Sequence, residues 1–122
     1  MTDRQLLEAA AKAAGLNVFW HEDLQRMVYF VGSAWHPLAW QPLLDDGDAF
    51  RLAVRLGLAV IPYPIYAKPK HSVIAKQYDH ARYLRGESED ARIEEIEVYG
   101  DDACAATRRA IVRAAAALGG AL

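Results

Sequence analysis

Cysteine is almost absent from this sequence, and its scarcity excludes two kinds of architecture. Cys104 is the single cysteine among the 122 residues. One thiol cannot form a disulfide within the chain or build a multi-cysteine zinc site, so a disulfide-stapled secreted fold is excluded. The chain depends on its own core, for which 53% hydrophobic and 25% charged residues suffice. We expect a single domain over residues 1–122.

Long apolar runs are missing as well. No stretch approaches the roughly 18 consecutive apolar residues that are needed to span a bilayer. Residues 1–4 lead directly into an amphipathic pattern, without the layout of a signal peptide. The sequence therefore predicts a cytoplasmic protein that has no membrane partner.

The sequence also lacks the motifs of common catalytic and cofactor sites. It contains no glycine-rich phosphate loop, nucleophile elbow or kinase-like set of motifs. We therefore expect a protein that is not an enzyme and binds no cofactor; a small enzyme whose residues meet only in the fold is the alternative. No metal site is expected either, because no close metal-ligand spacing relates the four histidines, which are His21, His36, His71 and His80. A zinc site assembled across strands stays open.

Helical patterns occur in three places. Thr2 and Gln5 form a capping-box signature, and apolar residues then recur at helical spacing up to Gly15. A second helix is predicted over residues 45–56, with an aspartate as N-cap and Gly57 as the stop. A third begins at Asp101 or Asp102 and ends at residues 119–120.

Strand patterns fill the rest of the chain. Aromatic and β-branched residues indicate a hairpin over residues 17–21 and 25–31, followed by strands over 58–61, 72–78 and 92–99. Pro62 and Pro64 predict that the strand at 58–61 lies at an edge of the sheet or leaves the sheet. The order α-β-β-α-β-β-β-α predicts an α/β (α+β) fold. We expect an α-β-α sandwich with three helices around a mostly antiparallel sheet of about five strands.

Two helical faces bear on function. In the second helix, Ala49, Phe50, Ala53 and Val54 are predicted to form one buried apolar stripe. In the third helix, Cys104 is predicted to be a buried, inert thiol on the apolar face. The alternative is a nucleophile that the helix dipole activates in the first turn.

The segment AWHPLAWQPLLDDGD, residues 34–48, repeats Ala-Trp-x-Pro-Leu and ends in three aspartates. The two prolines favour an extended, turning connector. We expect Trp40 and Leu43 to pack over the start of the second helix, and Asp45 and Asp48 to satisfy its free N–H groups. A metal or ligand loop made by Asp45, Asp46 and Asp48 is the alternative, although the spacing lacks the ligand pattern of a calcium loop.

Two stretches carry a family resemblance. WQPLLDDGDAFRLAVRL (residues 40–56) and DACAATRRAIVRAAAA (residues 102–117) resemble the patterns W-x-P-L-x-D-D-G-D-A-x-R-L-A-V and A-x-R-R-A-I-V-R-A-A of small phage and prophage proteins with a phage ABA sandwich domain. The resemblance implies an α-β-α sandwich and a phage or prophage gene in a bacterial cytoplasm, with no established biochemical function. The chain departs from the pattern by duplicating the AWxPL unit and by carrying Gln41 where the family has asparagine.

The first functional hypothesis is a non-enzymatic phage accessory protein that binds a host or phage protein, with a homodimer as a further form of association. Trp35, Tyr63 and Tyr66 are the predicted anchors, because aromatic residues on proline-stiffened connectors offer contact area at low ordering cost. For each of them, burial in the protein's own core is the structural alternative.

The competing hypothesis is a nucleic-acid-binding protein that uses the basic, tyrosine-rich segment 66–85. Its candidate residues are Lys68, Lys70, Lys76, Tyr78 and Arg82, and the third helix would extend the surface through Arg108, Arg109 and Arg113. The structural alternative is that Lys76 or Arg82 pairs across a hairpin with Glu94 or Glu97. A net charge of -2 argues against a protein built mainly to hold nucleic acid.

Overall fold

The computed structural model describes residues 1–32, 36–63, 72–78, 84–86 and 91–120. Within these residues the chain alternates helices with short strands, as the sequence predicts. The elements are α1 (Asp3–Ala14), β1 (Phe19–His21), β2 (Arg26–Tyr29), β3 (Leu38–Ala39), α2 (Asp46–Leu56), β4 (Ala59–Tyr63), β5 (Ser72–Tyr78), β6 (Ala91–Val98) and α4 (Ala103–Leu118).

The predicted ends of the helices are confirmed. Thr2 and Gln5 form a reciprocal capping box at the start of α1. Asp45 caps α2, and Gly57 ends it in the left-handed conformation (φ 63°), which glycine adopts without strain. Asp102, rather than Asp101, caps α4. None of the helices in the described part of the chain is long and apolar enough to cross a membrane.

The strands form two antiparallel sheets, so the predicted single sheet of about five strands is wrong. The first sheet has the order β1-β2-β3 and the second the order β4-β5-β6. The connector itself supplies β3, which pairs Leu38 with Tyr29 and Ala39 with Val28, and the Trp40 N–H continues the pairing to the Met27 carbonyl. Because the connector occupies the free side of β2, that strand has no edge left for the later strands to join.

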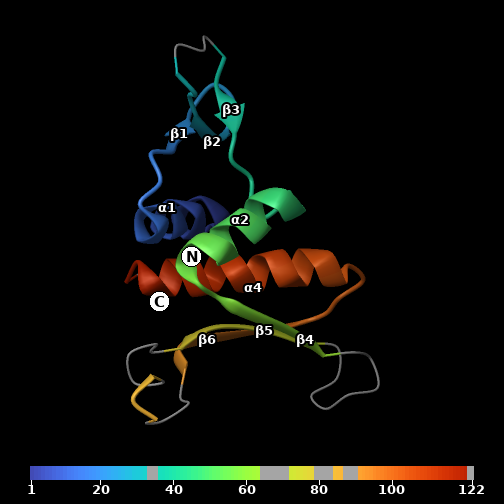
Figure 1. Cartoon of the computed structure of the whole chain (residues 1–122). Helices are drawn as coiled ribbons and strands as arrows, with labels where there is room; N and C mark the ends of the chain where they lie inside the picture. The colour runs from blue at the N-terminus through green and yellow to red at the C-terminus, as the bar shows by residue number, and fades with distance from the viewer. Residues whose placement is uncertain (33–35, 64–71, 79–83, 87–90, 121–122) are drawn as a thin grey trace.

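The layers also lie in a different order from the predicted sandwich. Figure 1 shows α1, α2 and α4 in the middle, with the first sheet at one end of the molecule and the second sheet at the other. α4 packs on the second sheet, α1 and α2 pack on α4, and the first sheet contacts α1. The helices therefore form an inner layer between the two sheets, whereas the sequence predicts them outside one sheet.

Small side chains allow these layers to pack closely. α4 buries Ala110, Ala114 and Ala115 completely, and α1 buries Ala10 completely. Alanine keeps the helix axes close together while burying apolar surface. Trp40 supplies the bulk that alanine lacks, since only 6% of its surface is exposed. The prediction that Trp40 packs into the core at the start of α2 is confirmed, and Leu43 is half-buried against the same core.

Candidate functional site

The exposed face of α2 differs from the face that the sequence predicts, and the difference bears on function. Ala49 and Ala53 are buried as predicted, together with Leu52. Phe50 and Val54, predicted on the same buried stripe, are 68% and 64% exposed. Successive residues of a helix are about 100° apart, so a stripe that contains Leu52, Ala49 and Ala53 turns Phe50 and Val54 toward solvent. That part of the predicted stripe is wrong.

A groove lies between α2 and the first sheet, and we call it the sheet-side groove. Its volume is about 630 Å³, and it is open along the surface rather than enclosed. Trp40, Leu52 and Val18 contribute apolar walls, and the sheet side is lined by Tyr29 of β2 and by Phe30, which follows that strand. A volume of this size lies in the range of known ligand sites. The sheet-side groove can therefore hold a bulky apolar group.

The α2 wall of the sheet-side groove carries charge. Asp48 is buried, and its carboxylate accepts hydrogen bonds from the backbone N–H of Gln41 at 2.9 Å and from Arg51 at 2.7 Å. The sequence predicts that Asp48 satisfies free N–H groups of the helix. Asp48 instead bonds the backbone of Gln41 and so ties the connector to α2. The hydrogen bond to Asp48 raises the pKa of Arg51 above its usual value. Arg55, one turn further along, donates from Nε to the carbonyl of Ala14.

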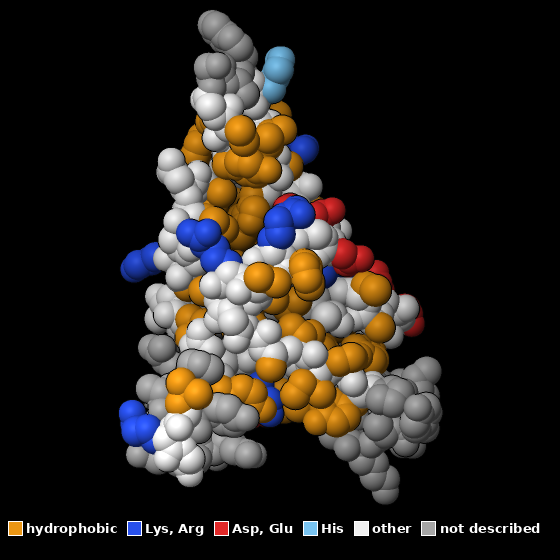
Figure 2. Space-filling model, viewed as in Figure 1, with side chains coloured by type: hydrophobic (Ala, Val, Ile, Leu, Met, Phe, Trp, Pro, Cys, Tyr) orange, Lys and Arg blue, Asp and Glu red, His pale blue; other side chains and the backbone are white. Residues whose placement is uncertain are grey.

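A second groove lies on the other side of α2, toward α4 and β4, and we call it the α4-side groove. Its volume is about 490 Å³, and Ala53, Val60 and Ile111 are among its apolar lining residues. Phe50 and Val54 line both grooves and form the ridge between them. Figure 2 shows hydrophobic side chains on both sides of α2. The ridge and its two grooves make one apolar surface.

Cys104 also lines the α4-side groove and is exposed, so the prediction of a buried thiol is wrong. Its position in the first turn of α4 explains the difference, because the buried residues of that helix begin at Ala110. We expect a maleimide to label Cys104 in the native protein as completely as in urea. A Cys104→Ser variant is the control, and a native thiol that reacts only after unfolding would contradict the exposed position.

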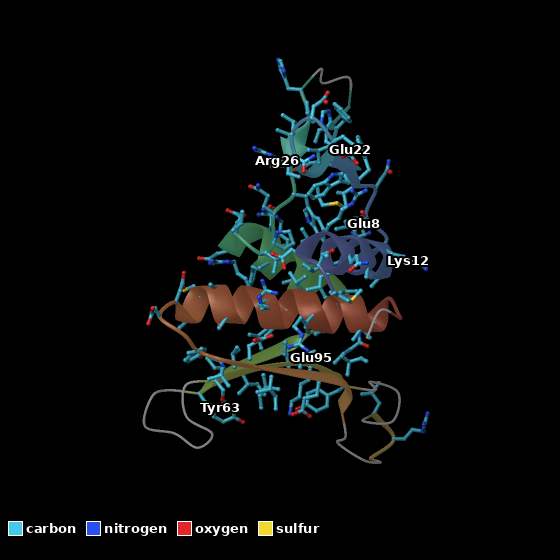
Figure 3. All side chains as sticks on the ribbon, turned by 180° about the vertical axis from the view of Figure 1, so that it is seen from behind. Glu8, Lys12, Glu22, Arg26, Tyr63 and Glu95 are labelled. Carbon is cyan, nitrogen blue, oxygen red and sulfur yellow. The ribbon has the colours of Figure 1, made fainter. Side chains whose placement is uncertain are left out.

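Of the aromatic anchors predicted from the sequence, the structure describes Tyr63. Trp35 and Tyr66 lie outside the described residues. Tyr63 is half-buried at the end of β4, and Figure 3 shows it on the side of the second sheet that faces away from the helices. Glu95 lies on the opposite side of that sheet, toward α4. Tyr63 lines neither of the grooves beside Phe50 and Val54.

Of the candidate residues in the basic segment, the structure describes Lys76 and Tyr78; Lys68, Lys70 and Arg82 lie outside the described residues. Lys76 stands opposite Glu94 in the β5–β6 register, as the charge-pairing alternative predicts. Its Nζ lies 5.0 Å from the centre of the Tyr78 ring, and the contact with Tyr78 raises the pKa of Lys76. This lysine is thus engaged within its own sheet.

The three arginines of α4 each bond an acidic side chain. Arg108 bonds Asp46 at 2.6 Å, and Arg109 bonds Asp3 at 3.3 Å. Arg113 bonds Glu97 at 2.7 Å, which raises the pKa of the arginine, and it also contacts Glu95. Each arginine links α4 to another part of the protein, and the extension of the nucleic-acid surface onto this helix stays a prediction. Binding of nucleic acid through segment 66–85 stays a prediction.

The three aspartates at the start of α2 all bond to donors within the protein. Asp45 accepts from the backbone N–H of Asp48, Asp46 from Arg108, and Asp48 from Gln41 and Arg51. Among the described residues, no group of three or more His, Cys, Asp or Glu side chains is placed to hold a metal ion.

The described histidines lie apart from this surface. His21 accepts a hydrogen bond through Nδ1 from the backbone N–H of Leu24 in the β1–β2 turn, and His36 is exposed before β3. His71 and His80 lie outside the described residues.

Comparison of the chain with protein-family models, with curated proteins and with solved structures finds no match. The resemblance to phage ABA sandwich proteins stays a prediction. The function of the protein is therefore inferred from its own surface.

Proposed function

We propose that this protein is a non-enzymatic accessory protein of a phage or prophage, and that it binds a host or phage protein through the α2 surface. The α2 surface consists of the ridge of Phe50 and Val54, the sheet-side groove and the α4-side groove. It replaces Trp35, Tyr63 and Tyr66 as the proposed anchor site.

The exposure of Phe50 and Val54 between two apolar grooves is the observation that carries this proposal. A Phe side chain that is 68% exposed contributes little to the stability of its own fold. A single exposed apolar side chain is ordinary, but here two of them adjoin grooves of about 630 and 490 Å³. Binding sites between proteins are rich in aromatic anchors that stand beside pockets.

The chemistry of the α2 surface favours binding over catalysis. The ionisable groups in the walls of the two grooves include Asp48, Arg51 and Arg108, and each of these bonds a partner within the protein. Their bonds fix the position of α2 on the rest of the fold. The apolar ridge is thus held on a rigid element, which lowers the ordering cost of docking.

The test is site-specific photo-crosslinking in bacterial cells that contain the phage or prophage genes. A photoreactive benzoylphenylalanine replaces Phe50, and in a matched variant it replaces Leu44, which is 71% exposed and lines neither groove. We expect irradiation to give a discrete protein adduct at position 50 and none at position 44. Mass spectrometry identifies the protein in the adduct.

Two results would contradict the proposal. Equal adducts at both positions would mean that position 50 is not a specific site. Adducts with nucleic acid alone would support the competing function, and binding that falls steeply as salt rises would support it further.

A further inference from the structure

The sheet-side groove combines an apolar floor with a cationic rim. Arg51 and Arg55 lie on its α2 wall, and among the described residues that line it Asp48 is the one with a carboxylate. From this combination we infer that the groove binds an acidic, amphipathic segment of the partner protein. The inference rests on the proposed function and names the chemistry of the partner at the same surface.

The two arginines of the groove are more exposed to a ligand than Asp48 is. Both oxygens of Asp48 are already bonded, one to Gln41 and one to Arg51, and the side chain of Asp48 is only 12% exposed. The side chain of Arg51, in contrast, is 70% exposed. A guanidinium has five N–H donors, so Arg51 and Arg55 keep donors for a ligand after their internal bonds. Asp45, which lies outside the groove lining, places a second carboxylate 3.8 Å from Arg51. The free N–H donors of Arg51 and Arg55 still favour a ligand that carries carboxylates.

Internal bonds also hold the two arginines in place before a ligand arrives. Arg51 is held by Asp48, with Asp45 at 3.8 Å. Arg55 is held by the carbonyl of Ala14, at the C-terminal end of α1, where a cation is favoured by the helix dipole. Because less side-chain freedom is lost on binding, anchored arginines make better recognition groups than free ones.

The spacing of the arginines predicts the spacing of the acidic residues. Arg51 and Arg55 are four residues apart in α2, which corresponds to about 6 Å along the helix axis. Acidic side chains two residues apart in an extended segment, or four apart in a helix, have a similar separation of about 6 to 7 Å. We expect Asp or Glu at one of these spacings in the partner segment.

The apolar part of the partner segment is set by the remaining walls. Trp40, Leu52 and Val18 lie in the groove, and Phe50 stands at its edge. A bulky side chain such as Leu, Phe or Trp beside the acidic pair would cover these walls while its neighbours reach the arginines. This arrangement distinguishes an amphipathic acidic segment from a purely charged one.

The test is selection of a displayed library of random peptides on the immobilised full chain, with Phe50→Ser protein used to remove peptides that bind elsewhere. We expect the enriched peptides to carry a bulky apolar residue with Asp or Glu at the spacings above. A synthetic copy of the most enriched peptide should bind the Arg51→Gln, Arg55→Gln double variant about tenfold more weakly, or worse. Gln keeps an N–H donor for Asp48 and for the Ala14 carbonyl, which protects the fold.

Arg26→Gln is the matched control, because Arg26 is exposed on the first sheet and lines none of this groove. The Arg26→Gln variant should change binding less than twofold. A single Arg55→Gln variant removes one positive charge and leaves the bond between Arg51 and Asp48 in place, so weaker binding by it reports the lost charge alone. Enriched peptides without acidic residues, or equal binding by the double variant, would overturn the inference while leaving docking at Phe50 intact. A library that yields no Phe50-dependent peptide would overturn it too. Loss of the position-50 adduct would instead overturn the proposed function.

Discussion

Trp40→Ala lowers the free energy of unfolding by about 3–5 kcal/mol, whereas Phe50→Ala changes it by about 0.5 kcal/mol or less. Trp40 is 6% exposed and belongs to the core, so truncation removes buried contacts and leaves a cavity. Phe50 is 68% exposed, and its truncation leaves the core unchanged. Urea unfolding followed by circular dichroism measures both changes.

Comparing the Trp40→Ala and Phe50→Ala variants distinguishes the aromatic residue that stabilises the fold from the one that binds the partner. Both side chains line the sheet-side groove, so a comparison of groove binding alone cannot distinguish them. We expect Phe50→Ala to lose partner binding at full stability and Trp40→Ala to lose stability first. Equal destabilisation by the two variants would mean that Phe50 is buried in solution, and the α2 surface would then have no exposed anchor.

Local signals made most of the secondary structure predictable from the sequence. The Thr2–Gln5 capping box and the Asp45 cap are bonds between residues three apart in the chain, and the sequence displays both partners of each bond. The strand at residues 72–78 was predictable from three β-forming residues, Val73, Ile74 and Tyr78. The prediction that β4 is an edge strand is confirmed, and Pro62 lacks the N–H that a central strand would need.

The arrangement of the elements was not predictable in the same way, because it depends on bonds between distant residues. The division into two sheets follows from the pairing of Leu38 and Ala39 with β2, and a two-residue strand carries almost no periodic signal. The ion pair of Arg108 was unpredictable for the same reason. It is one of several arginines in its helix, and its partner Asp46 lies 62 residues away.

The candidate site was hidden in the sequence by an excess of apolar residues in one short helix. α2 has the sequence DGDAFRLAVRL, in which Ala49, Leu52 and Ala53 already provide a buried face. One signal was present. Phe50 with Val54, and Arg51 with Arg55, are two pairs at a spacing of four residues, on helix faces next to each other. An apolar pair beside a cationic pair, outside a complete buried face, indicates a surface for a partner.

Gly119→Ala should destabilise the protein by about 1–3 kcal/mol, although alanine favours a helical end more than glycine does. A Cβ atom at position 119 would lie 2.5 Å from the carbonyl oxygen of Ala9 in α1. Backbone cannot swing aside as a flexible side chain can, so α1 and α4 would have to move apart. Chemical denaturation and the melting temperature measure the effect.

Gly100→Ala is the matched control, since a Cβ atom there meets no atom within 4 Å and the residue has no left-handed conformation to preserve. It should leave stability unchanged or raise it by up to about 1 kcal/mol, because alanine reduces the freedom of the unfolded chain. At position 119, helix propensity alone predicts that alanine stabilises the protein, whereas packing predicts that it destabilises the protein. A stabilised Gly119→Ala protein would mean that α1 and α4 are not in close contact, and the alanine-rich helical layer that supports the α2 surface would need a different arrangement.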